Sequence, residues 1–195
     1  PAFTSGGTAS LAENATGTVY TATAIPEAGK SLTYSLTGAD ASLFNINATT
    51  GVVTFKSSPN YEAPGDAGGN NVYDINVKAF DGTNSSTQAV AISVTNVNEA
   101  PTVTSAATAS VGENAAGTVY TAAATDPDAG TTLTYSLTGA DASLFDINAT
   151  TGAITFKSSP DYEAPGDAGG NNVYDVTVGV SDGTITTTKA VAITV

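Results

Sequence analysis

Carboxylate side chains are the residues of this sequence with the clearest capacity for chemistry, because they recur at matching places in two halves of the chain. Glu13 and Glu113 stand in Glu-Asn steps near the start of each half, and Asp81 and Asp182 each precede a glycine. The rest of the set is Glu62 and Glu163, each after a tyrosine, and the pair Asp126 and Asp128 on either side of Pro127. Acidic groups that converge from several loops repel one another unless a cation lies between them.

The composition leaves oxygen atoms as the ligands for any metal. The chain contains no Cys and no His, which excludes a Ser-His-Asp triad, a thiol nucleophile and an ordinary zinc site. Oxygen donors suit Ca²⁺ or Mg²⁺, and Ca²⁺ takes about six to eight of them, which only several segments together can supply. We therefore expect Ca²⁺ as the cofactor and no enzymatic activity.

Charge and hydropathy exclude two classes of partner. The net charge of −13 and the lack of a basic patch argue against nucleic acid. No apolar run approaches the ~20 residues of a membrane span, and no signal peptide is visible. Small residues abound and charged residues make up only 12% of the chain, which we interpret as a secreted cell-surface repeat.

An internal repeat defines the domain organisation. The 43 residues of Leu32–Asp74 recur as Leu133–Asp175 with four differences, among them Asn60/Asp161. A repeat of this length predicts one domain used twice, with domains at 1–99 and 100–195, and 195 residues suffice for two domains of about 100. Two nearly identical domains in succession favour a structural spacer over a catalyst.

Short alternating segments predict an all-β fold of two tandem seven-stranded Greek-key sandwiches, Ig-like or cadherin-like. In 72–80, Tyr73, Ile75, Val77 and Ala79 form the expected core face, and Phe80 points outward. Residues 39–44 could form one helical turn, and Pro101 ends the linker that starts at Asn96. The other strands expected in the first half lie at 18–24, 32–36, 52–55 and 89–97.

These acidic positions and the linker 96–101 resemble the cadherin repeat, in the bacterial form found in large surface adhesins, including those of the RTX type. The resemblance covers nearly the whole chain twice. It implies Ca²⁺ between successive domains, held by the acidic end of one domain, the linker and the start of the next. At the junction the implied ligands are Glu13, Asn60 and Glu62 from the first domain, Asn96, Asn98 and Glu99 from the linker, and Asp126, Asp128 and Asp182 from the second domain.

The sequence departs from this pattern in two places. Asn60 and Asn96 stand where the family usually has Asp, so the affinity should fall. The first domain has Ile25-Pro26-Glu27 in place of the Asp126-Pro127-Asp128 turn, which predicts no complete site at its start. The second domain keeps a weaker half-site of Glu113, Asp161 and Glu163.

Three functions remain open. The first is a calcium-binding extender of a bacterial cell-surface adhesin, with neighbouring repeats of the same chain as partners. The second is a ligand-binding module for polysaccharide or for another copy of the adhesin, and the third is an accessory domain of a secreted hydrolase. Asp40, Asp66 and Asp74 and their equivalents are expected to be loop, cap or solvated acids, and 63–70 a flexible surface loop.

Overall fold

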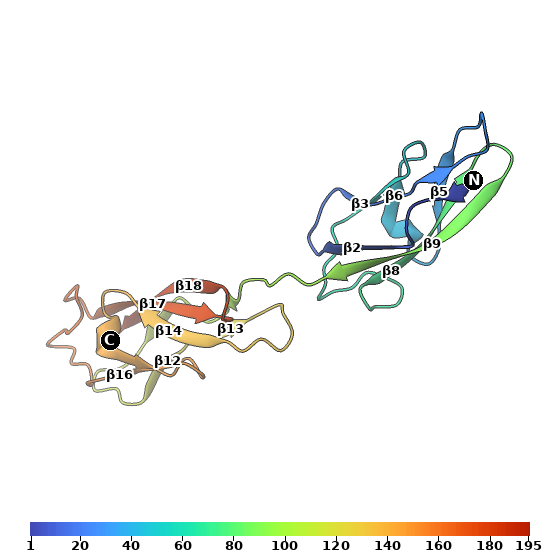
Figure 1. The fold of residues 1–195 in the computed structure, drawn as a ribbon. Coiled ribbons are helices and arrows are strands. Elements are labelled where there is room, and N and C mark those ends of the chain that lie inside the picture. The colour runs from blue at the N-terminus through green and yellow to red at the C-terminus, as the bar shows by residue number, and fades with distance from the viewer. The chain divides into compact units, whose positions relative to one another are not determined.

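A computed structural model describes all 195 residues of the chain. The chain divides into two compact units, 1–97 and 98–195, which we call domain 1 and domain 2 (Figure 1). Linker residues 98 and 99 thus group with domain 2, two residues before the boundary expected from the sequence. Both helices are 3₁₀ turns of three residues, and neither could cross a membrane.

Domain 1 is built from short strands joined by glycine-rich and asparagine-rich turns. The helical turn expected within 39–44 is the 3₁₀ helix η1 (Ala41–Leu43). The strands are β1 (Ala2–Phe3), β2 (Thr8–Ala12), β3 (Thr18–Thr21), β4 (Ala24–Ile25), β5 (Thr33–Thr37), β6 (Phe44–Ile46), β7 (Val52–Phe55), β8 (Val72–Phe80) and β9 (Ser85–Thr95).

Domain 2 repeats the same order of elements. Its 3₁₀ helix is η2 (Ala142–Leu144). The strands are β10 (Thr102–Val103), β11 (Thr108–Ser110), β12 (Thr118–Thr121), β13 (Ala124–Thr125), β14 (Thr134–Thr138), β15 (Phe145–Ile147), β16 (Ala153–Phe156), β17 (Val173–Ser181) and β18 (Thr186–Thr194).

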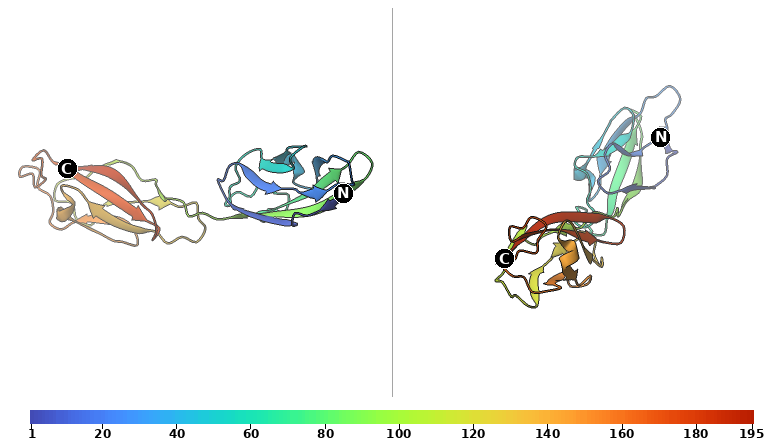
Figure 2. Two further views of the ribbon diagram at one scale, coloured as in Figure 1. Left: turned by 45° about the horizontal axis from the view of Figure 1, so that its top comes forward. Right: turned by 90° about the vertical axis from the view of Figure 1, so that its left-hand side faces the viewer.

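Each domain is a two-layer sandwich, which confirms the predicted fold class. In domain 1 one sheet has the order β2-β9-β8-β5 and the other has the order β3-β7-β6. A separate two-stranded ladder of β1 and β4 adds to these seven strands. Strand β2 runs parallel to β9, while the other pairs are antiparallel. Domain 2 has the same orders, and its layers can be followed in Figure 2.

Two expected strands differ from the observed ones by more than one residue at an end. The segment 18–24 divides, because β3 pairs with β7 only as far as Thr21 while Ala24 pairs with Phe3 of β1. The last strand covers Ser85–Thr95 rather than 89–97, and it gains its early residues from a complete antiparallel register with β8. It ends before Val97 because the N–H of Val97 donates to a carboxylate and not to a neighbouring strand.

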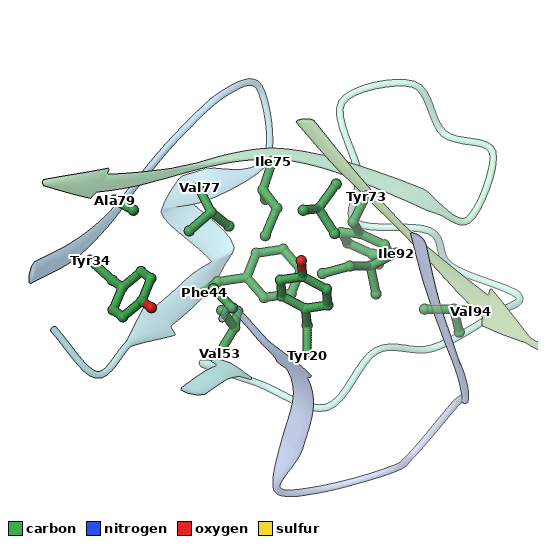
Figure 3. Packing of buried hydrophobic residues seen from close by; sticks show 12 residues of the cluster. Tyr20, Tyr34, Phe44, Val53, Tyr73, Ile75, Val77, Ala79, Ile92 and Val94 are labelled. Atoms are coloured by element: carbon green, nitrogen blue, oxygen red, sulfur yellow. The ribbon is translucent and has the colours of Figure 1, made fainter. Parts of the chain in front are cut away.

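The core of domain 1 forms between the two layers, and the predicted inward face of β8 is confirmed. Tyr73, Ile75, Val77 and Ala79 are each at most 2% exposed. In Figure 3 these side chains point toward residues of the opposite layer. Phe80 is 40% exposed, as its outward position predicts, and the Lys78 ammonium lies 5.8 Å from the centre of its ring. Alternation along β8 therefore places the core correctly.

Two buried carboxylates organise the loops of domain 1. Asp40 accepts hydrogen bonds at 2.7 Å from the backbone N–H groups of Ala67 and Asp74. Asp66 is also buried, and it accepts hydrogen bonds from the N–H groups of Asn70 and Asn71 at 3.0 Å each. Burial raises the pKa of Asp66, but the backbone hydrogen bonds lower it to a net value below the usual range.

Domain 2 contains the same arrangement in Asp141 and Asp167. The expectation that Asp40 and Asp66 are loop acids is therefore right about their position and incomplete about their burial. The segment 63–70 contains Asp66, and hydrogen bonds from its own backbone N–H groups to Asp66 hold the segment. Asp74, in contrast, lies exposed on β8.

Gly51 closes the turn between β6 and β7, and an added side chain would be strained there. Its φ is 71°, and a Cβ would lie 2.3 Å from the carbonyl oxygen of Ala22. We predict that Gly51→Ala destabilises domain 1 by about 2–5 kcal/mol, from left-handed strain plus the clash. Gly17→Ala is the matched control, because its φ is 96° and nothing lies within 4 Å. It should cost about 1–2 kcal/mol in urea unfolding; equal costs would contradict the clash.

Candidate metal centre

Glu13 lies at the trailing end of domain 1, the end at which β9 finishes. Its side chain is 3% exposed, and its own N–H donates to Thr95 O at 2.9 Å. Oε1 accepts a hydrogen bond from Val97 N–H at 2.8 Å, and Oε2 accepts one from Tyr61 N–H at 2.9 Å. A carboxylate has about four lone-pair sites, so each oxygen can accept these bonds and still bind a cation.

Three further predicted ligands belong to the same end of domain 1. Glu62 is half-buried, and one of its carboxylate oxygens lies within 4.8 Å of an oxygen of Glu13. Asn60 is exposed, and its Oδ1 accepts a hydrogen bond from Ala63 N–H at 2.9 Å. Asn96 is exposed just beyond β9. The structure thus brings Glu13 and Glu62 together, and it shows that Asn60 shapes the loop that carries Glu62.

Asp126 and Asp128 lie in one hydrogen-bonded turn at the leading end of domain 2, the end at which the chain enters this domain. Asp126 Oδ1 accepts a hydrogen bond from Asp128 N–H at 2.9 Å. Asp128 Oδ2 accepts one from Glu99 N–H, also at 2.9 Å. The turn follows directly after β13, so the β10-β13 ladder positions it beside the linker residue that it binds.

Asp182 completes this end of domain 2 from the far side of the sequence. It follows β17, and its Oδ1 accepts hydrogen bonds from the N–H groups of Thr184 and Ile185 at 2.6 Å each. Its Oδ2 accepts one from the side-chain amide of Asn98 at 2.8 Å. The Ile185 N–H and the Asn98 amide lower the pKa of Asp182, which keeps the carboxylate charged.

One oxygen of this leading end shows that the residues fit a cation. Asp126 Oδ2 is buried and accepts no hydrogen bond within the protein. Burial of a carboxylate oxygen without a partner is costly, and a bound cation would remove that cost. The donors around it are carboxylates and amides, and such hard oxygen ligands fit Ca²⁺.

The three residues predicted as a weaker half-site lie together at the trailing end of domain 2. Glu113, Asp161 and Glu163 each place one carboxylate oxygen within 4.8 Å of the others, and all three side chains are exposed. Tyr162 N–H donates to Glu113 Oε2 at 3.2 Å, as Tyr61 N–H does to Glu13. The two domains therefore present the same acidic end, with Asp161 in place of Asn60.

The leading end of domain 1 differs from that of domain 2, as the sequence suggests. Glu27 is exposed, and its Oε1 accepts a hydrogen bond from the side-chain amide of Asn84 at 2.8 Å. Asp81 is buried, with Oδ1 bound to the N–H groups of Thr83 and Asn84. Ile25 is 62% exposed where domain 2 has a threonine. Glu27 is therefore hydrogen-bonded to a side chain of its own domain, and domain 1 has no equivalent of Asp126 beside it.

Fold and acidic ends together define a class, a tandem of cadherin-like β-sandwich domains. Residues 107–195 match the cadherin domain family. Cadherin domains are non-enzymatic, extracellular modules that typically mediate Ca²⁺-dependent adhesion. Domain 1 repeats the strand orders of the matched domain.

Solved structures with a similar fold span both domains. The human protocadherin-24 EC1-2 crystal structure (form II) has a TM-score of 0.69 and 20% identity, with 100% of this chain and 96% of that chain covered. Drosophila N-cadherin EC1-4 has a TM-score of 0.65 and 20% identity, with coverage of 96% and 47%. Mouse cadherin-23 EC22-24 has a TM-score of 0.62 and 22% identity, with coverage of 100% and 63%. A comparison with curated protein sequences found no match.

Proposed function

We propose that this chain is a calcium-binding extender of a bacterial cell-surface adhesin, in which Ca²⁺ bound at the junction of the two domains restricts bending of the linker. The observation that carries the proposal concerns two consecutive linker residues. Val97 N–H is bound by Glu13 of domain 1, and the Asn98 side chain is bound by Asp182 of domain 2. Two adjacent linker residues are thus each bound by a carboxylate that the resemblance implies as a Ca²⁺ ligand, one in each domain.

The donor set at this junction supports a divalent cation. Domain 1 contributes Glu13 and Glu62, and the leading end of domain 2 contributes its three aspartates and Glu99. Carboxylates that converge on a common site repel one another in the absence of a cation. Bound Ca²⁺ would supply the positive charge, while backbone N–H groups hold the carboxylates of Glu13, Asp128 and Asp182 in fixed orientations.

The trailing end of domain 2 extends the proposal to neighbouring repeats. Glu113, Asp161 and Glu163 reproduce the acidic end of domain 1 with one more carboxylate. We infer that this end forms the first half of another Ca²⁺ site when a further repeat follows. A secreted, cell-surface location agrees with the small-residue composition, and the resemblance to repeats of large bacterial adhesins supports the adhesin assignment.

Calcium is expected to stabilise the two-domain chain against heat. Extracellular Ca²⁺ modules bind in the range of about 10⁻⁴–10⁻³ M. At free Ca²⁺ of about ten times Kd, one site adds about 1.4 kcal/mol, which corresponds to a Tm increase of about 5–10 °C for a domain of this size. Differential scanning calorimetry in EDTA and in millimolar Ca²⁺ measures the shift, and Mg²⁺ is the control that should have a smaller effect.

The mechanical part of the proposal has its own measurement. Small-angle X-ray scattering of the same samples should give a larger radius of gyration with Ca²⁺ than with EDTA, because a rigid linker prevents the domains from folding toward each other. An unchanged melting curve would reject the metal site. A raised Tm with identical scattering would keep the metal site and reject the extender, leaving a calcium-dependent ligand-binding module as the better account.

A further inference from the structure

Each domain contains an apolar pocket whose lining shares one residue with the proposed calcium sites, Asn60 in domain 1 and Asp161 in domain 2. In domain 1 it has a volume of about 250 Å³ and lies between the end of β7 and the loop that precedes β8. Domain 2 has the equivalent pocket, of about 270 Å³, between the end of β16 and the loop that precedes β17. Every residue that lines either pocket falls within the repeated 43-residue segment.

Aromatic rings form one side of the pocket in domain 1. Phe55 and Tyr73 pack edge to face, with ring centroids 5.0 Å apart. The Tyr73 hydroxyl accepts a hydrogen bond from Gly65 N–H at 3.1 Å, and because its side chain is 2% exposed it forms the buried back of the pocket. Leu43 extends the apolar lining. An aromatic or aliphatic group of about six carbon atoms would find ring contacts here.

A lysine stands at the border of each pocket. Lys56 Nζ donates to Ser42 O at 2.7 Å, and Lys157 Nζ donates to Ser143 O at 2.8 Å. An ammonium has three N–H donors, so this bond leaves donors for a ligand. The chain has only 5 basic residues and a net charge of −13. A cation fixed beside an apolar pocket on so acidic a protein favours a ligand with a negative charge at one end.

We propose that these pockets bind small aromatic carboxylates, with the ring against Phe55 and Tyr73 and the carboxylate on Lys56. The pocket in domain 2 uses the equivalent residues Phe156, Tyr174 and Lys157. A ligand of this class has an apolar body that the rings contact and one charge that the ammonium binds. The proposal does not require bound Ca²⁺, and because Asn60 and Asp161 belong to both sites, ligand binding is measured in EDTA.

The two pockets should differ in affinity, because their linings differ at one position. Domain 1 has Asn60 where domain 2 has Asp161. The extra negative charge of Asp161 repels a carboxylate, and one unit charge at the protein surface changes binding by roughly threefold to tenfold. The pocket in domain 1 should therefore bind an aromatic carboxylate more tightly than the pocket in domain 2.

Phenylacetate is the probe, and phenylacetamide is its uncharged counterpart. We titrate each into the ¹⁵N-labelled two-domain chain in EDTA and follow the amide signals of Ala63 and Ala164. A ligand of this size binds with a Kd on the order of millimolar. The expected result is tighter binding of the acid than the amide, with domain 1 preferred. Lys56→Gln should reduce phenylacetate binding in domain 1 to the level of the amide, whereas Lys78→Gln, on β8 outside the pocket, should not.

Exchange of the differing residue is the sharper test. Asn60→Asp should weaken binding in domain 1 by threefold to tenfold, roughly the effect of one surface charge, and Asp161→Asn should strengthen binding in domain 2 by a similar factor. Equal binding of acid and amide, or no change in these variants, would overturn the assignment of the carboxylate to Lys56. Shifts produced equally by acetate would show a plain anion site, and stronger binding of glucuronate would show a sugar site; each result would also overturn the proposal.

Discussion

Asp128→Asn is expected to weaken Ca²⁺ binding to the two-domain chain by at least about tenfold. Asp128 Oδ2 accepts the Glu99 N–H at 2.9 Å, and an asparagine oxygen can replace that hydrogen bond. The substitution therefore preserves the turn and removes one negative charge among the carboxylates proposed to bind the cation, where charge number sets affinity. Isothermal titration calorimetry of both proteins with Ca²⁺ measures the difference.

Asp146→Asn is the matched control for this loss. Asp146 is exposed on β15, and domain 1 has asparagine at the equivalent position, Asn45. Both variants lower the net negative charge by one unit, so a general charge effect would weaken binding equally in the two. Asp141 would be an unsuitable control, because it is buried and accepts two backbone hydrogen bonds at 2.7 Å. Similar calorimetric losses for Asp128→Asn and Asp146→Asn would show that the assignment of Asp128 as a ligand is wrong.

The sandwich could be predicted from the sequence because its longest strands carry a simple pattern. Alternation along β8 separates Tyr73, Ile75 and Val77 from polar neighbours, and each of these three is buried. The repeat then extends the same interpretation to domain 2. The ends of the shorter strands could not be predicted, since pairing partners decide them. Ala24 leaves the ladder of β3 because Phe3, more than twenty residues away in sequence, pairs with it.

The acidic positions could be predicted as a group, whereas their hydrogen bonds could not. The sequence places carboxylates after strands, and the structure shows Asp126, Asp128 and Asp182 at one end of domain 2. The resemblance implies Asn98 as a ligand, and the structure adds a hydrogen bond from its side-chain amide to Asp182. The direction of a side chain depends on the loop conformation around it, which residue types and spacing do not determine.

The buried carboxylates and the apolar pockets have no sequence signal of their own. Asp40 stands in a short Gly-Ala-Asp-Ala segment that reads as an ordinary turn. It becomes buried only because the loop containing Ala67 and the start of β8 close over it. The pocket beside Phe55 arises in the same way, from a loop that arches over a strand end. Both features depend on contacts between distant segments.

Asp40→Ala is expected to destabilise domain 1 strongly. The Asp40 side chain is 3% exposed, and its two oxygens accept the N–H groups of Ala67 and Asp74 at 2.7 Å each. Alanine would leave both donors buried and unpaired, at roughly 1–3 kcal/mol for each. The free energy of unfolding of domain 1 should therefore fall by about 2–6 kcal/mol. Hydrogen exchange of the Ile75 and Val77 amides in the two-domain chain reports on this domain separately.

Asp74→Ala separates the hydrogen bonds from the charge. Asp74 lies exposed on β8, and its backbone N–H, which binds Asp40, is kept when its side chain is removed. Both variants remove one negative charge from domain 1, so a stability change caused by net charge would be the same in each. We expect Asp74→Ala to change the free energy of unfolding by less than about 0.5 kcal/mol, as is usual for surface positions. If hydrogen exchange shows that the two variants lose the same free energy of unfolding, Asp40 does not hold the loop that carries Ala67 against the start of β8.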